Sequence, residues 1–225
     1  MVVSRQEGVQ LEVNHGGQQL EQVQSFKFLG SYKTATGDCS KDIKIQAALA
    51  RQKATELTNI WKDRNIKKVL KVRVMKQMMW AVFLHGAEGW TIKKSDKDRI
   101  EALEMWCWRK MLGVSWREHR TNKSILEELG VERELMAKVV KLKLQYFGHV
   151  ARGSAGQLAL TVPEGSMEGT RCQGKPRRQW INDIEDWTGY KYIQLKEMSV
   201  DREQWRKKIR ERSAAVANPR RRKAD

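Results

Sequence analysis

Cysteine is scarce in this chain of 225 residues. Only Cys39, Cys107 and Cys172 are present, far apart and odd in number, and no Cys-x-x-Cys pair occurs. This usage suits a reducing compartment. A zinc site would have to gather these cysteines with His119 or His149 across long loops, whereas structural zinc sites usually use closely spaced ligand pairs. We therefore expect neither a disulfide framework nor a metal centre.

Long apolar runs are missing as well. The N-terminal segment MVVSRQEGVQ lacks the apolar stretch of a signal peptide. No apolar run approaches the ~20 residues that a membrane-spanning helix needs. We expect a soluble intracellular protein, nuclear or cytoplasmic, with no membrane partner.

Catalytic motifs are a third absence. The chain has no Gly-x-Ser-x-Gly, no P-loop, no His-Glu-x-x-His and no adjacent pair of aspartates. Asp183 and Asp186 lie one helical turn apart and could hold Mg²⁺, but two acids beside two arginines more often form surface ion pairs. Polymerase-type catalysis needs carboxylates that hold two metal ions. The sequence therefore predicts no enzymatic activity for the chain on its own, and no cofactor.

Positive charge is what the chain has in excess. Lys and Arg total 44 against 27 Asp and Glu, which gives a net charge of +17. Residues 1–35 balance to zero, whereas residues 36–152 carry 25 basic and 14 acidic side chains. This sign favours a polyanionic partner, because each cation that neutralises a phosphate releases condensed counterions. We expect nucleic acid as the partner, whether RNA, DNA or their hybrid.

The hydrophobic pattern changes from strands to helices along the chain. Residues 9–34 form short alternating runs around the turn sequence Asn-His-Gly-Gly at 14–17, which predicts strands joined by tight turns. Residues 38–152 repeat apolar side chains at helical spacing, and a bundle following a small sheet is expected. The predicted buried stripes are Ile43, Ala47, Ala50, Ala54, Leu57 and Trp61; Ile100, Leu103, Cys107, Met111 and Val114; and Leu135, Val139, Leu142, Tyr146 and Val150.

The segment from Ile66 to Trp90 is the best candidate for a central helix. Its predicted buried stripe is Ile66, Leu70, Val74, Met78, Ala81 and Val82. Four lysines fall mostly off that stripe, and they form either a solvated face or a face for phosphates. On the helix predicted for residues 132–152, three lysines are expected at the surface. The lysines of the two helices are Lys67, Lys68, Lys71 and Lys76, and Lys138, Lys141 and Lys143.

The C-terminal part follows a glycine-rich stretch at 153–174 that we interpret as a linker. A helix is expected to open at Pro176, with Trp180, Ile184 and Trp187 on one side. Beside its start, Lys175, Arg177 and Arg178 predict a phosphate clamp at free backbone N–H groups. The alternative is that the arginines pair with a neighbouring acidic patch. The basic tail PRRRK is a nuclear-entry signal, a nucleic-acid-contacting arm or disordered charge.

Five segments occur in an order that resembles a known family. They are SFKFLGSYKTATGDCSKDIKIQAALARQ, HGAEGWT, EALEMWCWRKMLGVSWREHRTN, LQYFGHVAR and GKPRRQWINDIEDWTG. Together they resemble the C-terminal part of LINE-type (non-LTR) retrotransposon reverse transcriptases. The resemblance implies that the FKFLG segment belongs to the hairpin that grips the primer end, and that the helices after it form the thumb that holds the template–primer duplex. It also implies that the last two segments belong to a nucleic-acid-binding region.

The chain departs from this family in its catalytic part. The family's Tyr/Phe-x-Asp-Asp turn and its partner aspartate, which hold Mg²⁺, lie N-terminal to the material that resembles this chain. The opening MVVSR resembles the strand just after them, which implies that Met1 is an internal methionine of a longer ancestral frame. His85 stands where a Tyr is more usual, and Gly89 where a Thr is. Drift at such places fits a decaying or repurposed copy.

Two functions stay open. The first is a noncatalytic template–primer-binding fragment of a reverse transcriptase, for which a palm-containing polymerase segment is a second partner. The other is a repurposed helical protein-interaction module without nucleic-acid function. The expected fold is mainly α, with a palm remnant at 1–35, a thumb-like bundle at 36–152, a linker at 153–174 and a basic helical region at 175–225. The candidate residues are Phe26, Lys27, Phe28, Leu29 and Gly30 for the primer-grip-like hairpin, and Lys67, Lys68, Lys71, Lys76, Lys138, Lys141, Lys175, Arg177 and Arg178 for nucleic acid.

Overall fold

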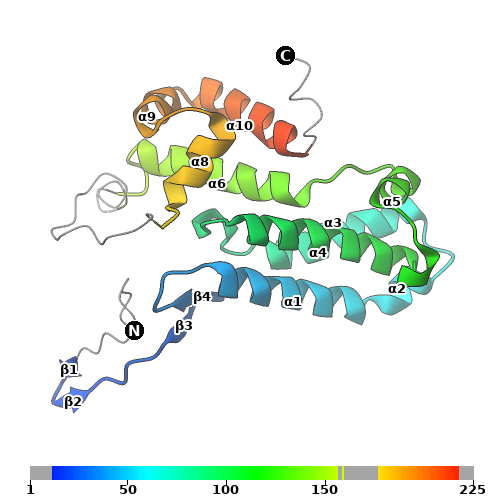
Figure 1. Cartoon of the computed structure of the whole chain (residues 1–225), viewed down its shortest axis with the longest axis horizontal. Coiled ribbons are helices and arrows are strands. Elements are labelled where there is room, and N and C mark those ends of the chain that lie inside the picture. Colours follow the sequence, from blue (N-terminus) through cyan, green and yellow to red (C-terminus); the bar gives the residue numbers. More distant parts are fainter. Residues whose placement is uncertain (1–11, 157–158, 160–176, 218–225) are drawn as a thin grey trace.

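Two short β-hairpins open the described part of the chain (Figure 1). The structure is a computed structural model that describes residues 12–156, 159 and 177–217. Each hairpin is a separate antiparallel pair. Leu29 and Gly30 form the second turn with φ of 47° and 86°, as a two-residue hairpin with matching twist requires. The prediction of strands joined by tight turns is confirmed for β1 (Asn14–His15), β2 (Gln18–Gln19), β3 (Ser25–Phe28) and β4 (Ser31–Thr34).

Helices make up the rest of the described chain, and the mainly α fold class is confirmed. Figure 1 shows α1, α3, α4, α6 and α10 running along the long axis of the molecule, with α8 and α9 at one end. Among the described helices, none has both the length and the hydropathy that a bilayer crossing requires. The elements are α1 (Ser40–Glu56), α2 (Thr58–Lys62), α3 (Lys68–Phe83), η1 (Ala87–Gly89), α4 (Lys94–Leu112), η2 (Trp116–Glu118), α5 (Asn122–Leu129), α6 (Leu135–Ala151), α8 (Trp180–Thr188), α9 (Tyr192–Val200) and α10 (Arg202–Ala217).

The core of the bundle lies between α1, α3, α4 and α6. In α1 the predicted stripe is buried at Ile43, Ala50 and Ala54, and these small alanines allow α3 and α4 to approach closely. Helix α4 is apolar on most of its circumference, and Leu103 and Trp108 are both fully buried. The sequence patterns for these two helices are therefore confirmed.

Helix α3 buries a different stripe from the predicted one. Met75, Met79 and Phe83 are fully buried, whereas Leu70 is 48% and Met78 42% exposed. Apolar residues occupy both sides of this helix, so the helical period alone does not decide which side packs inward. The side with the larger apolar area, which includes Phe83, is the one that the bundle covers. The predicted stripe is therefore wrong for this helix.

The helices after the predicted linker share the core of the bundle. Ile184 of α8, Leu195 of α9 and Trp205 of α10 belong to the same buried cluster as Leu144 of α6. Residues 153–156 and 159 are described, whereas the rest of the predicted linker, Lys175 and Pro176 lie outside the described residues. Helix α8 begins at Trp180 rather than at Pro176. The hydrophobic core therefore continues from α6 directly into α10.

Glu104 accepts hydrogen bonds at the start of α6 from inside the core. Its side chain is buried, and Oε1 accepts hydrogen bonds from the N–H groups of Glu134, at 2.8 Å, and Leu135, at 3.3 Å. Removal from water raises the pKa of Glu104 from 4.5 to about 7, and the two backbone donors oppose that shift. Between these values the folded state holds a proton at Glu104 that the unfolded state has released.

We expect the stability of the wild type to fall, relative to a Glu104→Gln variant, as the pH rises from about 4.5 to about 7. In this window the folded state binds more protons at this site, so raising the pH favours unfolding. The wild type should lose about 3 kcal/mol of unfolding free energy relative to the variant, and the loss is complete above pH 7. Urea unfolding of both proteins across this range measures it. A constant difference between the two would contradict the prediction.

Candidate nucleic-acid interface

The β3–β4 hairpin presents apolar side chains to solvent. Phe26 and Phe28 lie on the same face of β3, because alternate strand residues point the same way, and both are more than half exposed. Leu29 at the turn is 81% exposed. Lys27 points to the other face, where its Nζ lies 5.9 Å from the centre of the Tyr32 ring. The primer-grip-like segment is thus an exposed apolar tip.

Asp42 of α1 holds this hairpin against the bundle. Its two carboxylate oxygens, in a buried position, accept hydrogen bonds from Ser31 Oγ and from the N–H of Tyr32, both at 2.8 Å. The indole N–H of Trp90 donates to the same carboxylate, also at 2.8 Å. One buried acid therefore links the hairpin, α1 and the segment that precedes α4.

The hairpin turn has contacts of its own. Gln46 Nε2 donates to the carbonyl of Gly30 at 3.1 Å, and His85 Nε2 lies 2.7 Å from the carbonyl oxygen of Leu29. A Cβ at Gly30 would stand 2.8 Å from that His85 nitrogen, and the φ of Gly30 is positive, so glycine is required here. The exposed tip is therefore fixed in position from behind.

Most of the candidate lysines on α3 have partners within the chain. Lys68 pairs with Glu128 at 2.6 Å, and Lys76 pairs with Glu134 at 3.1 Å. Lys71 donates to the carbonyl of Trp61 at 2.7 Å. Lys67 is exposed and has no recorded partner among the described residues. Lys67 is therefore the α3 lysine most accessible to a phosphate.

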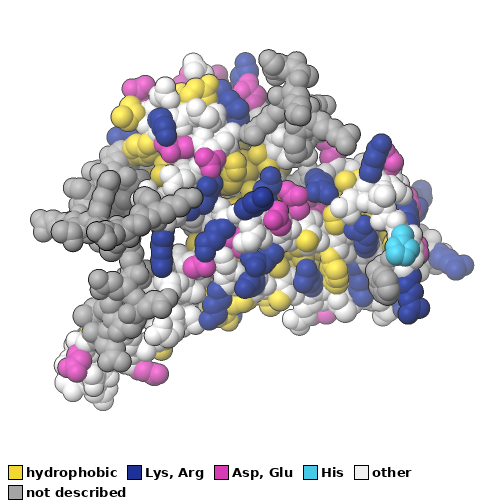
Figure 2. All heavy atoms as spheres, in the orientation of Figure 1, with side chains coloured by type: hydrophobic (Ala, Val, Ile, Leu, Met, Phe, Trp, Pro, Cys, Tyr) yellow, Lys and Arg dark blue, Asp and Glu magenta, His cyan; other side chains and the backbone are white. Residues whose placement is uncertain are grey.

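The face of α4 is also internally paired. Figure 2 shows basic side chains scattered along this side of the molecule with acidic side chains among them. Arg99 pairs with Asp96 at 2.7 Å, and both Lys97 and Arg133 pair with Glu101, at 3.7 and 2.9 Å. The two pairs of Glu101 are partly exposed and contribute little stability, but all three pairs lower the net field on this face.

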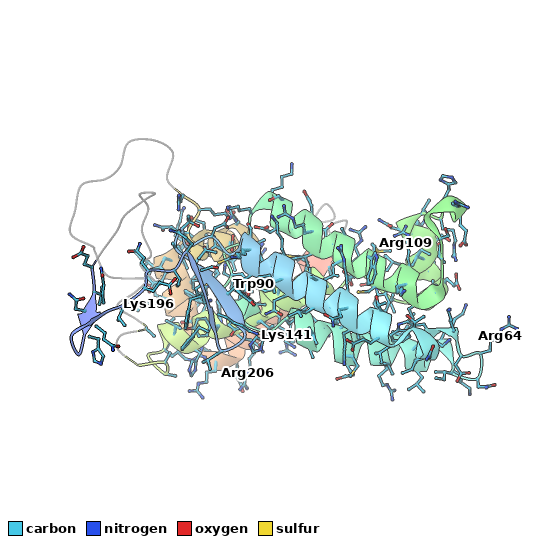
Figure 3. All side chains as sticks on the ribbon, turned by 90° about the horizontal axis from the view of Figure 1, so that it is seen from below. Arg64, Trp90, Arg109, Lys141, Lys196 and Arg206 are labelled. Atoms are coloured by element: carbon cyan, nitrogen blue, oxygen red, sulfur yellow. The ribbon has the colours of Figure 1, made fainter. Side chains whose placement is uncertain are left out.

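The solvent face of α6 is polar over its whole length. Positions 138, 141, 145, 149 and 152 follow one another in steps of three and four and therefore line one side of the helix. Lys138 lies 3.8 Å from Glu134, whereas Lys141 is exposed and has no recorded partner among the described residues. In Figure 3, Lys141 and Arg206 of α10 project on the same side of the molecule, opposite Arg109. Arg206 was not among the sequence candidates, whereas Lys141 was.

The arginine pair before α8 makes contacts inside the chain. Arg178 donates from Nε to Asp183 and from a terminal nitrogen to Asp186, both at 2.6 Å, and Arg177 donates to the carbonyl of Thr36 at 2.9 Å. The alternative that the arginines pair with neighbouring acids therefore describes Arg178. The predicted helix start at Pro176 is wrong, because α8 begins at Trp180 and its first turn is capped by the Gln179 and Asn182 side chains. The phosphate clamp itself stays a prediction.

Lys143, which was expected at the surface, is fully buried beneath α8. Its ammonium group pairs with Asp183, also fully buried, and donates to the carbonyl of Trp90 at 2.7 Å. The N–H of Ile92 donates to the same Asp183 oxygen at 2.9 Å. The ring centres of Trp180 and Trp187 lie 5.1 and 5.4 Å from the lysine nitrogen. Burial lowers the pKa of Lys143 to about 8, and Asp183 opposes the shift.

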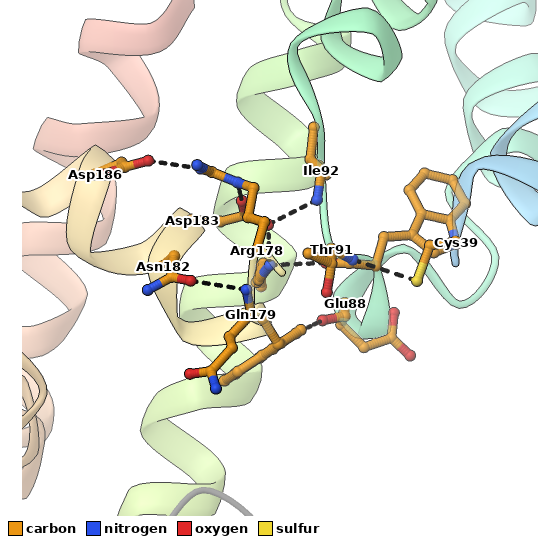
Figure 4. Close-up of polar contacts among 12 residues, drawn as sticks. Cys39, Glu88, Thr91, Ile92, Arg178, Gln179, Asn182, Asp183 and Asp186 are labelled. Atoms are coloured by element: carbon orange, nitrogen blue, oxygen red, sulfur yellow. Dashed lines mark hydrogen bonds and ion pairs between the residues drawn. The ribbon is translucent and has the colours of Figure 1, made fainter. Parts of the chain in front are cut away.

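We call this arrangement the clasp; it consists of Trp90, Ile92, Lys143, Arg178 and Asp183 (Figure 4). It joins the segment HGAEGWT to the segment GKPRRQWINDIEDWTG, two of those that carry the family resemblance. The Trp180 indole N–H adds a contact to the carbonyl of Glu88 at 2.8 Å. The role of the clasp is structural, because its charged groups are paired with each other. Within the described ranges, no three His, Cys, Asp or Glu side chains gather as a metal site would require.

Comparison with known proteins gives a distant relative. No protein-family model matches the chain, and no solved structure matches it. Over 204 residues the chain is 23% identical to an uncharacterized transposon-derived protein of Caenorhabditis elegans, a match that covers 85% of this chain and 72% of the relative. The similarity indicates a transposon origin.

Proposed function

We propose that this transposon-derived chain is a noncatalytic nucleic-acid-binding protein that corresponds to the C-terminal part of a LINE-type reverse transcriptase. The observation that supports this function best is the unpaired basic side of α6 and α10. Lys141, Arg202 and Arg206 are exposed there and have no recorded acidic partner among the described residues. On α3 and α4, in contrast, several basic groups already pair with acids, namely Lys68, Lys76, Lys97 and Arg99.

A polyanion is the partner that this arrangement favours. Unpaired cations on one side of a strongly basic protein repel one another, and phosphates relieve this repulsion while they release counterions. The net charge of +17 also attracts a polyanion at longer range. The interaction requires no particular base sequence, because lysine and arginine contacts to phosphates do not read the bases.

The β3–β4 hairpin supplies the second part of the proposal. Phe26 and Phe28 are exposed on one face, and the tip is held from behind by Asp42 and His85. Exposed aromatic rings on a fixed element can stack on bases of a single strand or a duplex end. This arrangement is compatible with the primer-grip role that the resemblance implies. Polymerization would need the palm aspartates from another polypeptide segment, because the chain has no adjacent aspartate pair.

Salt dependence provides the test. We expect the full chain to bind labelled DNA duplex, RNA–DNA hybrid and single-stranded RNA with an affinity that falls steeply as salt rises. Replacing Lys67 and Lys141 by Gln should weaken binding to every sequence and reduce the log–log salt slope by up to about 2, because two phosphate contacts are lost. Fluorescence anisotropy over a series of salt concentrations measures both quantities.

A matched variant separates contact from net charge. Lys53 and Lys123 are also lysines on helix surfaces, but each has a helical acid partner, Glu56 and Glu127. Replacing this pair by Gln removes the same two charges and should leave the slope close to that of the wild type. The proposed interface would be refuted if both double variants lowered the affinity and the salt slope equally. It would also be refuted if the affinity of the wild type did not change with salt.

One observation favours the protein-interaction alternative. The outer face of α3 leaves Leu70 and Met78 exposed at 48 and 42%, and Val69 in the first turn of the helix is 74% exposed. Apolar groups on one helix face suit a partner protein more than a phosphate backbone. Under this alternative, Leu70→Ser and Met78→Ser would abolish a partner complex whose affinity changes little with salt, and the lysine variants would not affect it.

A further inference from the structure

Three arginines meet where the end of α6 lies against the start of α10. Arg152 follows the last turn of α6, and Arg202 and Arg206 stand one turn apart on α10. A terminal nitrogen of Arg152 donates to the carbonyl of Ser199 at 2.8 Å, while its Nε is buried and has no hydrogen-bond partner among the described residues. Part of this guanidinium is therefore fixed by the protein, and part has an unmet donor.

The helices approach closely at this point because Gly148 has no side chain. Trp205 inserts against α6 and donates from Nε1 to the carbonyl of Leu144 at 3.0 Å. A Cβ on Gly148 would lie 2.3 Å from that indole nitrogen and 3.0 Å from a terminal nitrogen of Arg152. Arg202 and Arg206 flank Trp205 on α10. The close packing therefore brings their positive charges toward Arg152.

Within the described part of the chain, the positive charges of these arginines face one another, and no carboxylate is recorded as a partner. The pKa of Arg152 is lowered first by burial and then by the positive charges of Arg202 and Arg206. Asp201, which precedes Arg202, accepts the N–H groups of Glu203 and Gln204 through one oxygen and so caps the start of α10. No ion pair is recorded for any of the three arginines within residues 12–156 and 177–217. A like-charge cluster of this kind destabilises the folded chain unless an anion joins it.

We propose that Arg152, Arg202 and Arg206 form a binding site for a phosphate group. Guanidinium groups from two helices can reach several oxygens of one tetrahedral anion, and Arg binds phosphate through paired N–H donors. The Nε of Arg152 is too buried to meet the anion itself, so its N–H reports binding at the rest of the same guanidinium. As a nucleic-acid contact this site rests on the proposed function; phosphate binding by the cluster itself does not.

The first experiment uses inorganic phosphate on the full chain at constant ionic strength. Phosphate should raise the melting temperature of the wild type and shift the Nε–H resonance of Arg152 in ¹H–¹⁵N spectra. Arg206→Gln should raise the melting temperature without phosphate, because the repulsion is relieved, and should remove most of the phosphate effect. Lys207→Gln removes an exposed charge next to Arg206 but outside the cluster, and should behave as the wild type in both measurements.

The second experiment distinguishes a backbone phosphate from a terminal one. Arg206→Gln should weaken binding of an oligonucleotide about tenfold at low salt and lower the salt slope by about 0.9, the value for one phosphate contact. An equal loss for 5′-phosphorylated and 5′-hydroxyl strands assigns the site to an internal phosphodiester. A loss confined to the phosphorylated strand assigns it to a terminal phosphate. Both results support the site.

Two results would overturn the site. One is an Arg152 resonance that phosphate does not move. The other is identical behaviour of Arg206→Gln and Lys207→Gln in all measurements. If the wild type still binds oligonucleotides with a steep salt slope in these cases, the proposed function stands and only the cluster fails. If phosphate moves the Arg152 resonance but no oligonucleotide binds, the cluster stands as a site for free phosphate and the proposed function fails.

Discussion

An Asp183→Asn variant should lose about 3–5 kcal/mol of unfolding free energy, the typical cost of breaking a buried ion pair by removing one partner. Both Asp183 and Lys143 are fully buried, and the Lys143 ammonium lies between two tryptophan rings with one carbonyl as its other acceptor. Without the carboxylate, Lys143 must either stay charged with too little compensation or release its proton. Urea unfolding at neutral pH measures the loss.

Two further variants make this result specific. Asp186 pairs with the same arginine but is exposed, so Asp186→Asn should cost no more than about 1 kcal/mol. A double variant, Asp183→Asn with Lys143→Met, removes the buried cation as well and should recover much of the loss. If Asp183→Asn and Asp186→Asn are equally mild, the clasp contributes no more than a surface ion pair.

The pH dependence of this loss follows from the pKa of Lys143. That pKa is about 8 in the folded chain against an ordinary value of 10.5, so the unfolded state binds more protons at Lys143 between these values. The cost of burying the charged lysine is present below pH 8 and disappears as the pH approaches 10.5. Asp183 attracts only the charged form, so its removal lowers the folded-state pKa of Lys143 further. The stability difference between wild type and Asp183→Asn should therefore narrow as the pH rises toward about 8 and stay constant above it.

Trp80→Ala should cost about 3–5 kcal/mol, because it removes a large buried aromatic side chain from the middle of the bundle. Trp80 is 1% exposed, and its ring meets that of Trp108 edge to face at 5.5 Å. Its indole N–H donates to Glu134 at 2.8 Å, so the variant also leaves that carboxylate with one donor fewer. Chemical denaturation with a melting curve on the same sample measures the loss.

A Trp80→Phe variant separates volume from hydrogen bonding. Phenylalanine keeps most of the ring packing against Trp108 and loses only the contact to Glu134, so its cost should be about 1–3 kcal/mol. Nucleic-acid binding measured well below the melting temperature should be unchanged in both variants, because Trp80 is buried. A stable Trp80→Ala protein with weakened binding would instead place this residue at the interface.

The packing of α1 and α4 could be predicted from the sequence because each has one clear apolar face or is apolar nearly all round. Ala50 and Ala54 in α1, and Leu103 and Trp108 in α4, lie where the period places them. Helix α3 could not be predicted in this way. It carries apolar residues on two sides, and the choice between them depends on the surfaces that neighbouring helices offer.

The charged groups were harder to predict than the helices. Lys143 falls four residues after Val139 and seven before Val150, so it occupies the buried stripe, and that spacing was the available signal. Its partner Asp183 lies 40 residues away, and no local pattern relates the two. The arginine cluster had a partial signal, since Arg202 and Arg206 are one turn apart. The third member, Arg152, comes from another helix. Its position near the other two depends on the close packing of Gly148 against Trp205, which no local sequence pattern predicts.

The clasp also determines where the chain can be cut. A fragment ending at residue 156 would contain every helix of the bundle from α1 to α6. It would nevertheless expose the α6 surface that α10 covers and leave Lys143 with the Trp90 carbonyl as its one acceptor among the described residues. Expression fragments that begin anywhere before the hairpins should therefore extend through α10. In a shortened genomic copy, a stop codon before Asp183 removes the counterion of a lysine encoded 40 codons upstream.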